Sequence, residues 1–97
     1  MKYIKTFEDN NVNQGLLCVK EPHKDYYWKY TSGKKYKIYY SSVGKRIKDD
    51  NGKFDTNTVT SILYNNEKEC EYAGSIFTTD NSIEDYELRK KSEKFNL

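Results

Sequence analysis

Residues 45–56 read KRIKDDNGKFDT, and this stretch decides how the chain on either side of it folds. Asn51 and Gly52 tolerate the positive φ angles of a two-residue type I′ turn, and this dipeptide is a strong short-range signal for a β-hairpin. The flanking residues 45–48 and 53–56 have the length of short strands. The sequence therefore predicts an antiparallel hairpin in which 53–56 pairs back onto 45–48.

Further strand-length segments lie on both sides of this hairpin. Residues 35–40 alternate polar and apolar side chains, as a half-buried strand does, and residues 25–30 are dense in aromatic residues that favour β-structure. For 59–64 we expect a strand, with a helical turn at its start as an alternative. The expected strands are residues 15–20, 25–30, 35–40, 45–48, 53–56, 59–64 and 70–77.

After the last expected strand the pattern changes to that of a helix over residues 80–95. Ser82 is a suitable N-cap, and Asp85 stands where a capping box has Glu or Gln. Acidic residues come first and basic residues follow, which suits the helix dipole; Asp85–Arg89 and Glu87–Lys91 have the spacing of favourable pairs. For residues 1–14 a helical turn and an extended arm both remain open.

Length and composition predict a single small domain. The chain has 97 residues, of which 33% are charged and only 35% hydrophobic. Leu, Ile, Val and Phe together number 19, close to the level at which chains stay disordered. Ten Tyr and one Trp supply the missing apolar surface. We expect one mostly-β (α+β) domain over 1–97: a small antiparallel barrel or strongly twisted sheet over 15–77 and a C-terminal helix over 80–95.

Charge is unevenly distributed along the chain although its sum is only +2. Residues 15–54 carry a balance of +6, residues 55–87 a balance of −7, and the last ten residues a balance of +3. Such segregation either gives solvated strand faces or creates two faces of opposite potential, one of which meets a charged partner. The chain has no long apolar run that would predict a membrane span or a secretory signal, so we expect a cytoplasmic location.

The residues that commonly carry catalysis are too few and too scattered to predict an enzyme. Cys18 and Cys70 are the only thiols and lie in apolar stretches, which favours buried, unreactive side chains. His23 is the only histidine, so no set of four zinc ligands is present, and we expect no metal or cofactor. Asp49 and Asp50 precede Asn51-Gly52, where carboxylates shape turns rather than form an acid–base pair.

Two motifs at the centre of the chain resemble a known group of proteins. Residues 33–38 read GKKYKI and residues 47–52 read IKDDNG. A GKxYxI strand entry followed by IxDDNG is similar to small, mostly uncharacterised SH3-like β-barrel proteins of bacteriophages and of bacteria with AT-rich genomes. The resemblance covers residues 15–65. It implies a small barrel fold and transfers no catalytic residue.

Aromatic and basic side chains are interleaved over residues 26–40, which hold seven aromatic residues and four lysines. Two-residue alternation predicts that Tyr36, Ile38 and Tyr40 point inward, as do Tyr26, Trp28 and Tyr30. The core of a domain so poor in aliphatic residues needs many of these rings. Those left outside suit a protein interface or the stacking of nucleic-acid bases.

Two functional hypotheses follow. The leading one is a non-enzymatic binding protein encoded by a phage or mobile element, an inhibitor of anti-CRISPR or other anti-defence type, that binds a host protein or ribonucleoprotein. The alternative is a module that binds single-stranded nucleic acid. The candidate basic and aromatic binding residues are Tyr27, Lys29, Lys35, Lys37, Tyr39, Lys45 and Arg46, and the candidate acidic partner-facing residues are Glu67, Glu69, Glu71, Asp80 and Glu84.

Overall fold

A six-stranded antiparallel sheet forms the body of the protein, and the computed structural model describes residues 15–95 of it. Strand β1 lies in the middle of the sheet, between β2 and β6, and its first four residues, Gly15 to Cys18, are all buried. The sheet order is β4-β3-β2-β1-β6-β5. In chain order the elements are β1 (Gly15–Lys20), β2 (Lys35–Ser41), β3 (Gly44–Lys48), β4 (Phe54–Asp55), α2 (Thr60–Asn65), β5 (Glu69–Tyr72), β6 (Ser75–Thr78) and α3 (Ile83–Phe95).

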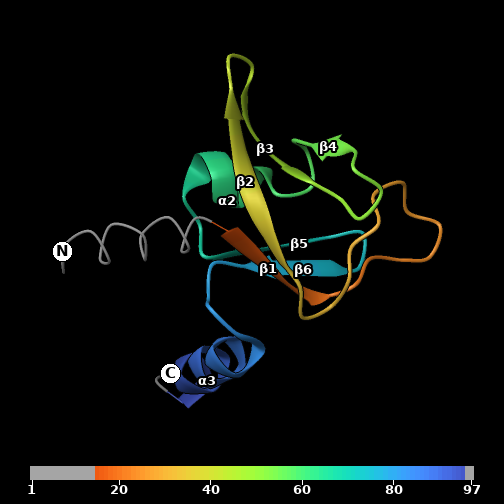
Figure 1. The fold of residues 1–97 in the computed structure, drawn as a ribbon. Coiled ribbons are helices and arrows are strands. Elements are labelled where there is room, and N and C mark those ends of the chain that lie inside the picture. Colours follow the sequence, from red (N-terminus) through yellow and green to blue (C-terminus); the bar gives the residue numbers. More distant parts are fainter. Residues whose placement is uncertain (1–14, 96–97) are drawn as a thin grey trace, which may run out of the picture.

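The sheet curls into a half-barrel, with α2 against β3 and β5 and with α3 beyond the end of the sheet (Figure 1). This confirms the expected mostly-β α+β architecture with a C-terminal helix. In the part of the chain that is described, no helix is long and apolar enough to cross a membrane. The open question of a helix or an arm over residues 1–14 lies outside the described residues.

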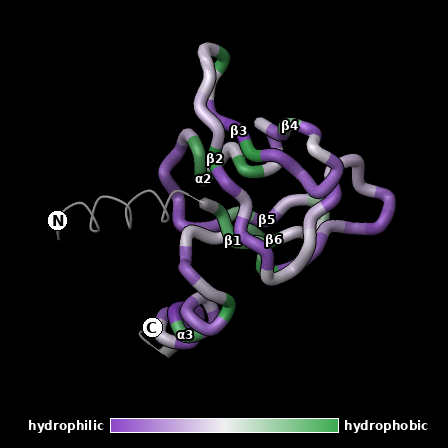
Figure 2. Tube along the Cα trace, in the orientation of Figure 1, coloured by the Kyte–Doolittle hydropathy of each residue, from purple (hydrophilic) through white to green (hydrophobic). Residues whose placement is uncertain are grey.

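The core is built from aromatic rings as well as aliphatic side chains, as the composition predicts. Tyr30, Tyr36 and Phe77 pack edge to face, with ring centroids 4.7 to 6.1 Å apart. Trp28 packs against the outside of this cluster. Figure 2 shows the hydrophobic stretches where β1, α2 and β6 meet, whereas α3 is mostly hydrophilic. The buried cluster consists of Leu16, Cys18, Tyr30, Tyr36, Ile47, Val59, Ile62, Leu63 and Phe77.

The hairpin of residues 45–56 forms, but its turn differs from the expected one. Ile47 pairs with Asp55 and Lys48 with Phe54, so β4 pairs back onto β3. Gly52 has a φ of 82°, whereas Asn51 does not have a positive φ, which rules out type I′. Asp49 explains the difference, because its Oδ1 accepts hydrogen bonds from the backbone N–H groups of Asn51 and Lys53 and makes a longer loop.

Residues 25–30 form part of a long loop between β1 and β2 and not the expected strand. Asp49 Oδ2 accepts a hydrogen bond from the Lys29 N–H, and the Asp50 N–H donates to the Lys29 carbonyl. These contacts use backbone groups that a ladder would need. The predicted alternation of side chains holds only in part: Tyr30 is buried, Tyr26 and Trp28 are half-buried and Tyr27 is exposed, but Lys29 is half-buried instead of exposed.

Residues 59–64 are mainly helical rather than extended. Val59, Ile62 and Leu63 are buried at i, i+3 and i+4, which is the spacing of one helix face. The buried Asp55 stabilises the turn that leads into this segment, because its Oδ1 accepts hydrogen bonds from the backbone N–H groups of Asn57 and Thr58. The alternative of a helical turn at the start of this segment was therefore the better prediction.

Two further expectations were wrong. Residues 70–77 form a hairpin, β5 and β6, because Ala73 and Gly74 have positive φ angles of 52° and 83° and turn the chain between them. Tyr40 is 60% exposed instead of inward. It pairs with Lys45 near the tip of the β2–β3 hairpin, which extends past the body of the half-barrel (Figure 1).

Candidate cationic surface

The outer face of β2, β3 and β4 gathers three cations and two aromatic rings. Because Ile47 is fully buried, alternation along β3 turns Arg46 and Lys48 outward. Tyr39 on β2 pairs directly with Arg46, and Phe54 on β4 pairs with Lys48. We call the set Lys37, Tyr39, Arg46, Lys48 and Phe54 the cationic surface.

Each cation of this surface lies over a ring. The guanidinium carbon of Arg46 is 4.0 Å from the centroid of Phe54. Lys48 Nζ lies 5.0 Å from the Phe54 centroid and 5.2 Å from the Tyr39 centroid, and Lys37 Nζ lies 5.5 Å from the latter. The two rings meet edge to face at 5.6 Å. Cation–π attraction restricts these long side chains and holds their charges together.

None of the three cations is neutralised within residues 15–95. The ion pairs formed there use Lys34, Arg89 and Lys90 as their cations, and none includes Lys37, Arg46 or Lys48. Arg46 Nε is buried without a hydrogen-bond partner in the same part of the chain. The nearby acids Asp49 and Asp50 are occupied by the β3–β4 turn and by the long loop. As far as residues 15–95 are concerned, the surface thus keeps its full positive charge.

The other predicted basic residues lie away from this cluster. Lys45 follows the opposite alternation from Arg46, with its Nζ 5.9 Å from the Tyr40 centroid. Lys35 Nζ donates to Asn81 Oδ1 at 3.4 Å, near the start of α3. Lys29 Nζ donates to the carbonyl oxygen of Lys24 in the long loop. The structure therefore brings together Lys37, Tyr39 and Arg46, but not the whole predicted set.

Tyr27 belongs to a separate contact on the long loop. Its exposed ring lies 4.2 Å from Lys53 Nζ and packs edge to face on Trp28. Lys53, Lys48 and Phe54 are absent from the sequence-predicted set. The hairpin register was the available signal for the last two, because residues 48 and 54 pair across the turn that the sequence did predict.

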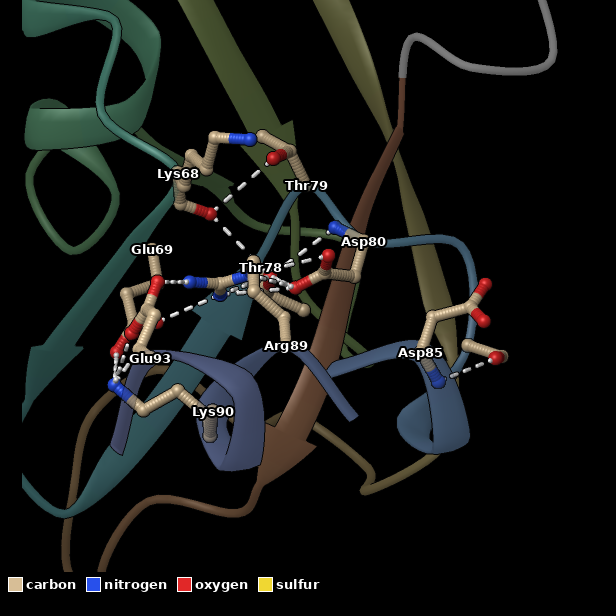
Figure 3. A network of polar contacts seen from close by, with 10 residues as sticks. Lys68, Glu69, Thr78, Thr79, Asp80, Asp85, Arg89, Lys90 and Glu93 are labelled. Atoms are coloured by element: carbon tan, nitrogen blue, oxygen red, sulfur yellow. Dashed lines mark hydrogen bonds and ion pairs between the residues drawn. The ribbon is translucent and has the colours of Figure 1, made fainter. Parts of the chain in front are cut away.

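The predicted acidic surface is divided by the docking of α3. Arg89 lies between Glu69 and Asp80, with N–O distances of 2.7 and 2.9 Å, and Thr78 Oγ1 donates to Asp80 (Figure 3). Lys90 adds a second cation to Glu69 at 3.2 Å. Glu69 and Asp80 are thereby neutralised by the chain's own helix.

The remaining acidic candidates do not join these two. Glu67 and Glu71 are exposed, and Glu84 lies in the first turn of α3. None of the three forms an ion pair with another described residue. Because its members are neutralised or separated, the acidic set does not form one continuous partner-facing surface.

The electrostatics of the Arg89 network favour its charged form. Desolvation acts to raise the pKa of Asp80 and of Glu69, but hydrogen bonds from Arg89, aided by Thr78 and Lys90, outweigh it and hold both pKa values below their usual range. The Asp80 hydrogen bonds in turn raise the pKa of Arg89. Charges stabilised in this way hold the helix and are not available to a partner.

The thiols and the histidine are dispersed. Burial raises the pKa of Cys18 to about 12 and that of Cys70 to about 11, so both remain thiols at neutral pH. Cys18 is fully buried, whereas Cys70 is only half-buried, against the expectation for the second. In the described part of the chain no three His, Cys, Asp or Glu side chains gather as a metal site would require.

Comparison with known proteins adds nothing to this geometry: no family model matches the chain, and neither does any curated protein or solved structure. The resemblance to SH3-like phage proteins therefore stays a prediction.

Proposed function

We propose that this is a non-enzymatic binding protein whose cationic surface binds the phosphate backbone of a nucleic acid, free or within a nucleoprotein. The observation that carries the proposal is a cluster of three cations, Lys37, Arg46 and Lys48, held on two rings without a carboxylate partner in the described chain. Phosphate oxygens are the common macromolecular anions that such a cluster fits, and releasing their counterions favours association.

The same geometry favours phosphate contacts over base stacking. Arg46 and Lys48 both lie over Phe54, and Lys37 and Lys48 lie over Tyr39. A base that stacked on these rings would have to displace the cations. Phosphate contacts position a protein without reading sequence, so the proposal is binding with little sequence preference.

The finer role proposed here is that of an inhibitor encoded by a phage or mobile element. Its target would be a ribonucleoprotein of a bacterial defence system, CRISPR complexes included, in the host cytoplasm. What supports it is the resemblance of residues 15–65 to phage SH3-like proteins. Occupying the site where a nucleoprotein holds its nucleic acid needs a charged surface and no catalytic group.

Fluorescence anisotropy with labelled oligonucleotides tests the proposal. A triple variant, Lys37→Ala, Arg46→Ala and Lys48→Ala, should lose about 100-fold in affinity at low salt, and the slope of log affinity against log salt should fall by roughly three. The matched control replaces three exposed lysines elsewhere, Lys20, Lys24 and Lys68, and removes the same net charge.

The control variant should lose far less affinity than the triple variant. Equal losses would show that only net charge matters and would contradict a specific surface. Absence of binding by the wild-type protein to single and double strands at low salt would contradict the proposal as a whole. Capture from host lysate with and without nuclease then separates free nucleic acid from a nucleoprotein target.

A further inference from the structure

Helix α3 has two faces, and the other residues that the structure describes contact only one of them. Arg89 and Lys90 contact Glu69 and Asp80 on the body, and Arg89 also pairs with Glu93 along the helix (Figure 3). The opposite face follows helical spacing. It consists of Glu84, Glu87, Leu88, Lys91 and Lys94, all exposed.

This outer face combines an apolar centre with unpaired charges. Leu88 is 66% exposed, and the face borders a groove of about 490 Å³. Glu84, Glu87, Lys91 and Lys94 form no ion pair within the described chain, and the expected Glu87–Lys91 pair is absent. Four adjacent charges of both signs thus surround an exposed leucine without being neutralised by any described residue.

The order of these charges is complementary to itself. Positions 84 and 94, and likewise 87 and 91, lie symmetrically about residue 89. A two-fold axis perpendicular to the helix at that level places each glutamate opposite a lysine of the second helix. With a rise of about 1.5 Å per residue, the two Leu88 side chains lie about 3 Å apart along the axis and pack on each other.

We infer that the outer face of α3 docks on the same face of a second copy of this chain, antiparallel and with two-fold symmetry. A parallel arrangement would oppose like charges, and a partner of one charge sign would match only half of the face. The antiparallel arrangement also brings opposite helix-dipole ends together and gives the isologous contact usual in homodimers. This inference does not depend on the proposed function.

The interface is small, because one helix of 13 residues with one central leucine supplies it. Contacts well below the standard interface area give weak, transient association. We therefore expect a monomer–dimer equilibrium in the micromolar to millimolar range rather than a permanent dimer.

Sedimentation equilibrium of the full chain tests the inference. The average mass of the wild-type protein should rise with concentration from 11.5 kDa toward twice that value. Leu88→Lys should shift the midpoint of this rise at least 10-fold upward. Because Leu88 is exposed, circular dichroism of the variant should match that of the wild-type protein.

Two charge-reversal variants test the antiparallel register. Glu84→Lys with Glu87→Lys makes the face wholly basic, and Lys91→Glu with Lys94→Glu makes it wholly acidic. Each should stay monomeric alone, and an equimolar mixture should form a heterodimer at lower concentration than the wild type forms its homodimer. A wild-type protein that stays monomeric throughout, a dimer that survives Leu88→Lys, or a mixture that fails to associate would each overturn the inference.

Discussion

In the half of the molecule built from β5, β6 and α3, opposite charges meet, whereas in the half built from β2, β3 and β4 cations meet aromatic rings. Arg89 lies between Glu69 and Asp80, so its charge and theirs cancel locally. Arg46 lies on Phe54, which restricts the guanidinium but leaves its charge intact.

This difference shows what each half does with its charged residues. In the acidic half (β5, β6 and α3), ion pairs hold a helix of which none of the described side chains belongs to the buried core. Cation–π contacts in the basic half pre-order a surface on a sheet that the core already stabilises. Removing a cation should therefore lower the stability of the protein in the acidic half, and lower its affinity for a partner in the basic half (β2, β3 and β4).

The largest expected effect on stability is that of Arg89→Met. The substitution leaves two partly buried carboxylates, Glu69 and Asp80, without their main partner, which costs roughly 2 kcal/mol. Because α3 is outside the core, the loss should be local. Amide hydrogens of α3 should exchange about 30-fold faster, while those of β1 change little. Hydrogen exchange at low protein concentration measures both.

The control for this prediction is Lys91→Met on the same helix, where no ion pair with a described residue is lost. It should change the free energy of opening of α3, as measured by hydrogen exchange, by less than about 0.5 kcal/mol, as ordinary surface substitutions do. If Arg89→Met left the exchange of α3 unchanged, the comparison between the two halves would fail, because the acids would then be free for a partner.

Sequence patterns located much of this architecture and only part of the candidate site. The alternation in 35–40 and the turn after Lys48 were sufficient to place β2, β3 and β4, and hence Lys37, Tyr39 and Arg46 near one another. The role of Glu69 was not accessible in this way, because its partner Arg89 is 20 residues away and on another element. The loop conformation of residues 25–30 was not predicted for the same reason, because the Asp49 side chain that binds its backbone is about 20 residues away.

A fall in pH should destabilise the attachment of α3 in the acidic half before it destabilises the sheet of the basic half. The pKa values of Glu69 and Asp80 are lowered in the folded protein, so their stabilising contribution is complete above the unfolded value near pH 4 and is lost as pH falls through the lowered folded values. As pH falls from about 5 to below 3, the protection of the α3 amides, measured relative to their intrinsic exchange rate at each pH, should decrease, and Arg89→Met should abolish most of this pH dependence.

Exchange in β3 provides the internal reference for this titration. Asp50 in the basic half also has a lowered pKa, because hydrogen bonds from Thr31, Tyr36 and Lys34 outweigh desolvation. Some acid sensitivity is therefore expected in the sheet. A loss of protection in β3 at a higher pH than in α3 would contradict the assignment of the Arg89 network as the acid-sensitive anchor.

The two hairpin turns show why a strong local signal was only half right. Asn51-Gly52 has the composition of a type I′ turn, yet the Asp49 carboxylate accepts two backbone hydrogen bonds and selects a longer loop. Ala73-Gly74 lacks that composition, yet both of its residues have positive φ. The pairing of Tyr72 with Ser75 and the burial of Phe77 impose the tight turn. A side-chain hydrogen-bond acceptor decides the first turn, and the pairing of the flanking strands decides the second.

The smallest effect is predicted at the Ala73-Gly74 turn. Here a substitution should raise stability instead of lowering it. Ala73 has a φ of 52°, a conformation that costs an L-residue other than Asn, Asp or Gly roughly 1 kcal/mol. Ala73→Asn creates the preferred Asn-Gly dipeptide and should stabilise the protein by about 0.5–1 kcal/mol in urea unfolding, without changing affinity for oligonucleotides. Asn51→Ala is the matched substitution in the other turn and should gain nothing, because residue 51 has no positive φ to relieve. Equal responses at the two positions would show that composition, and not the imposed backbone angle, governs these turns.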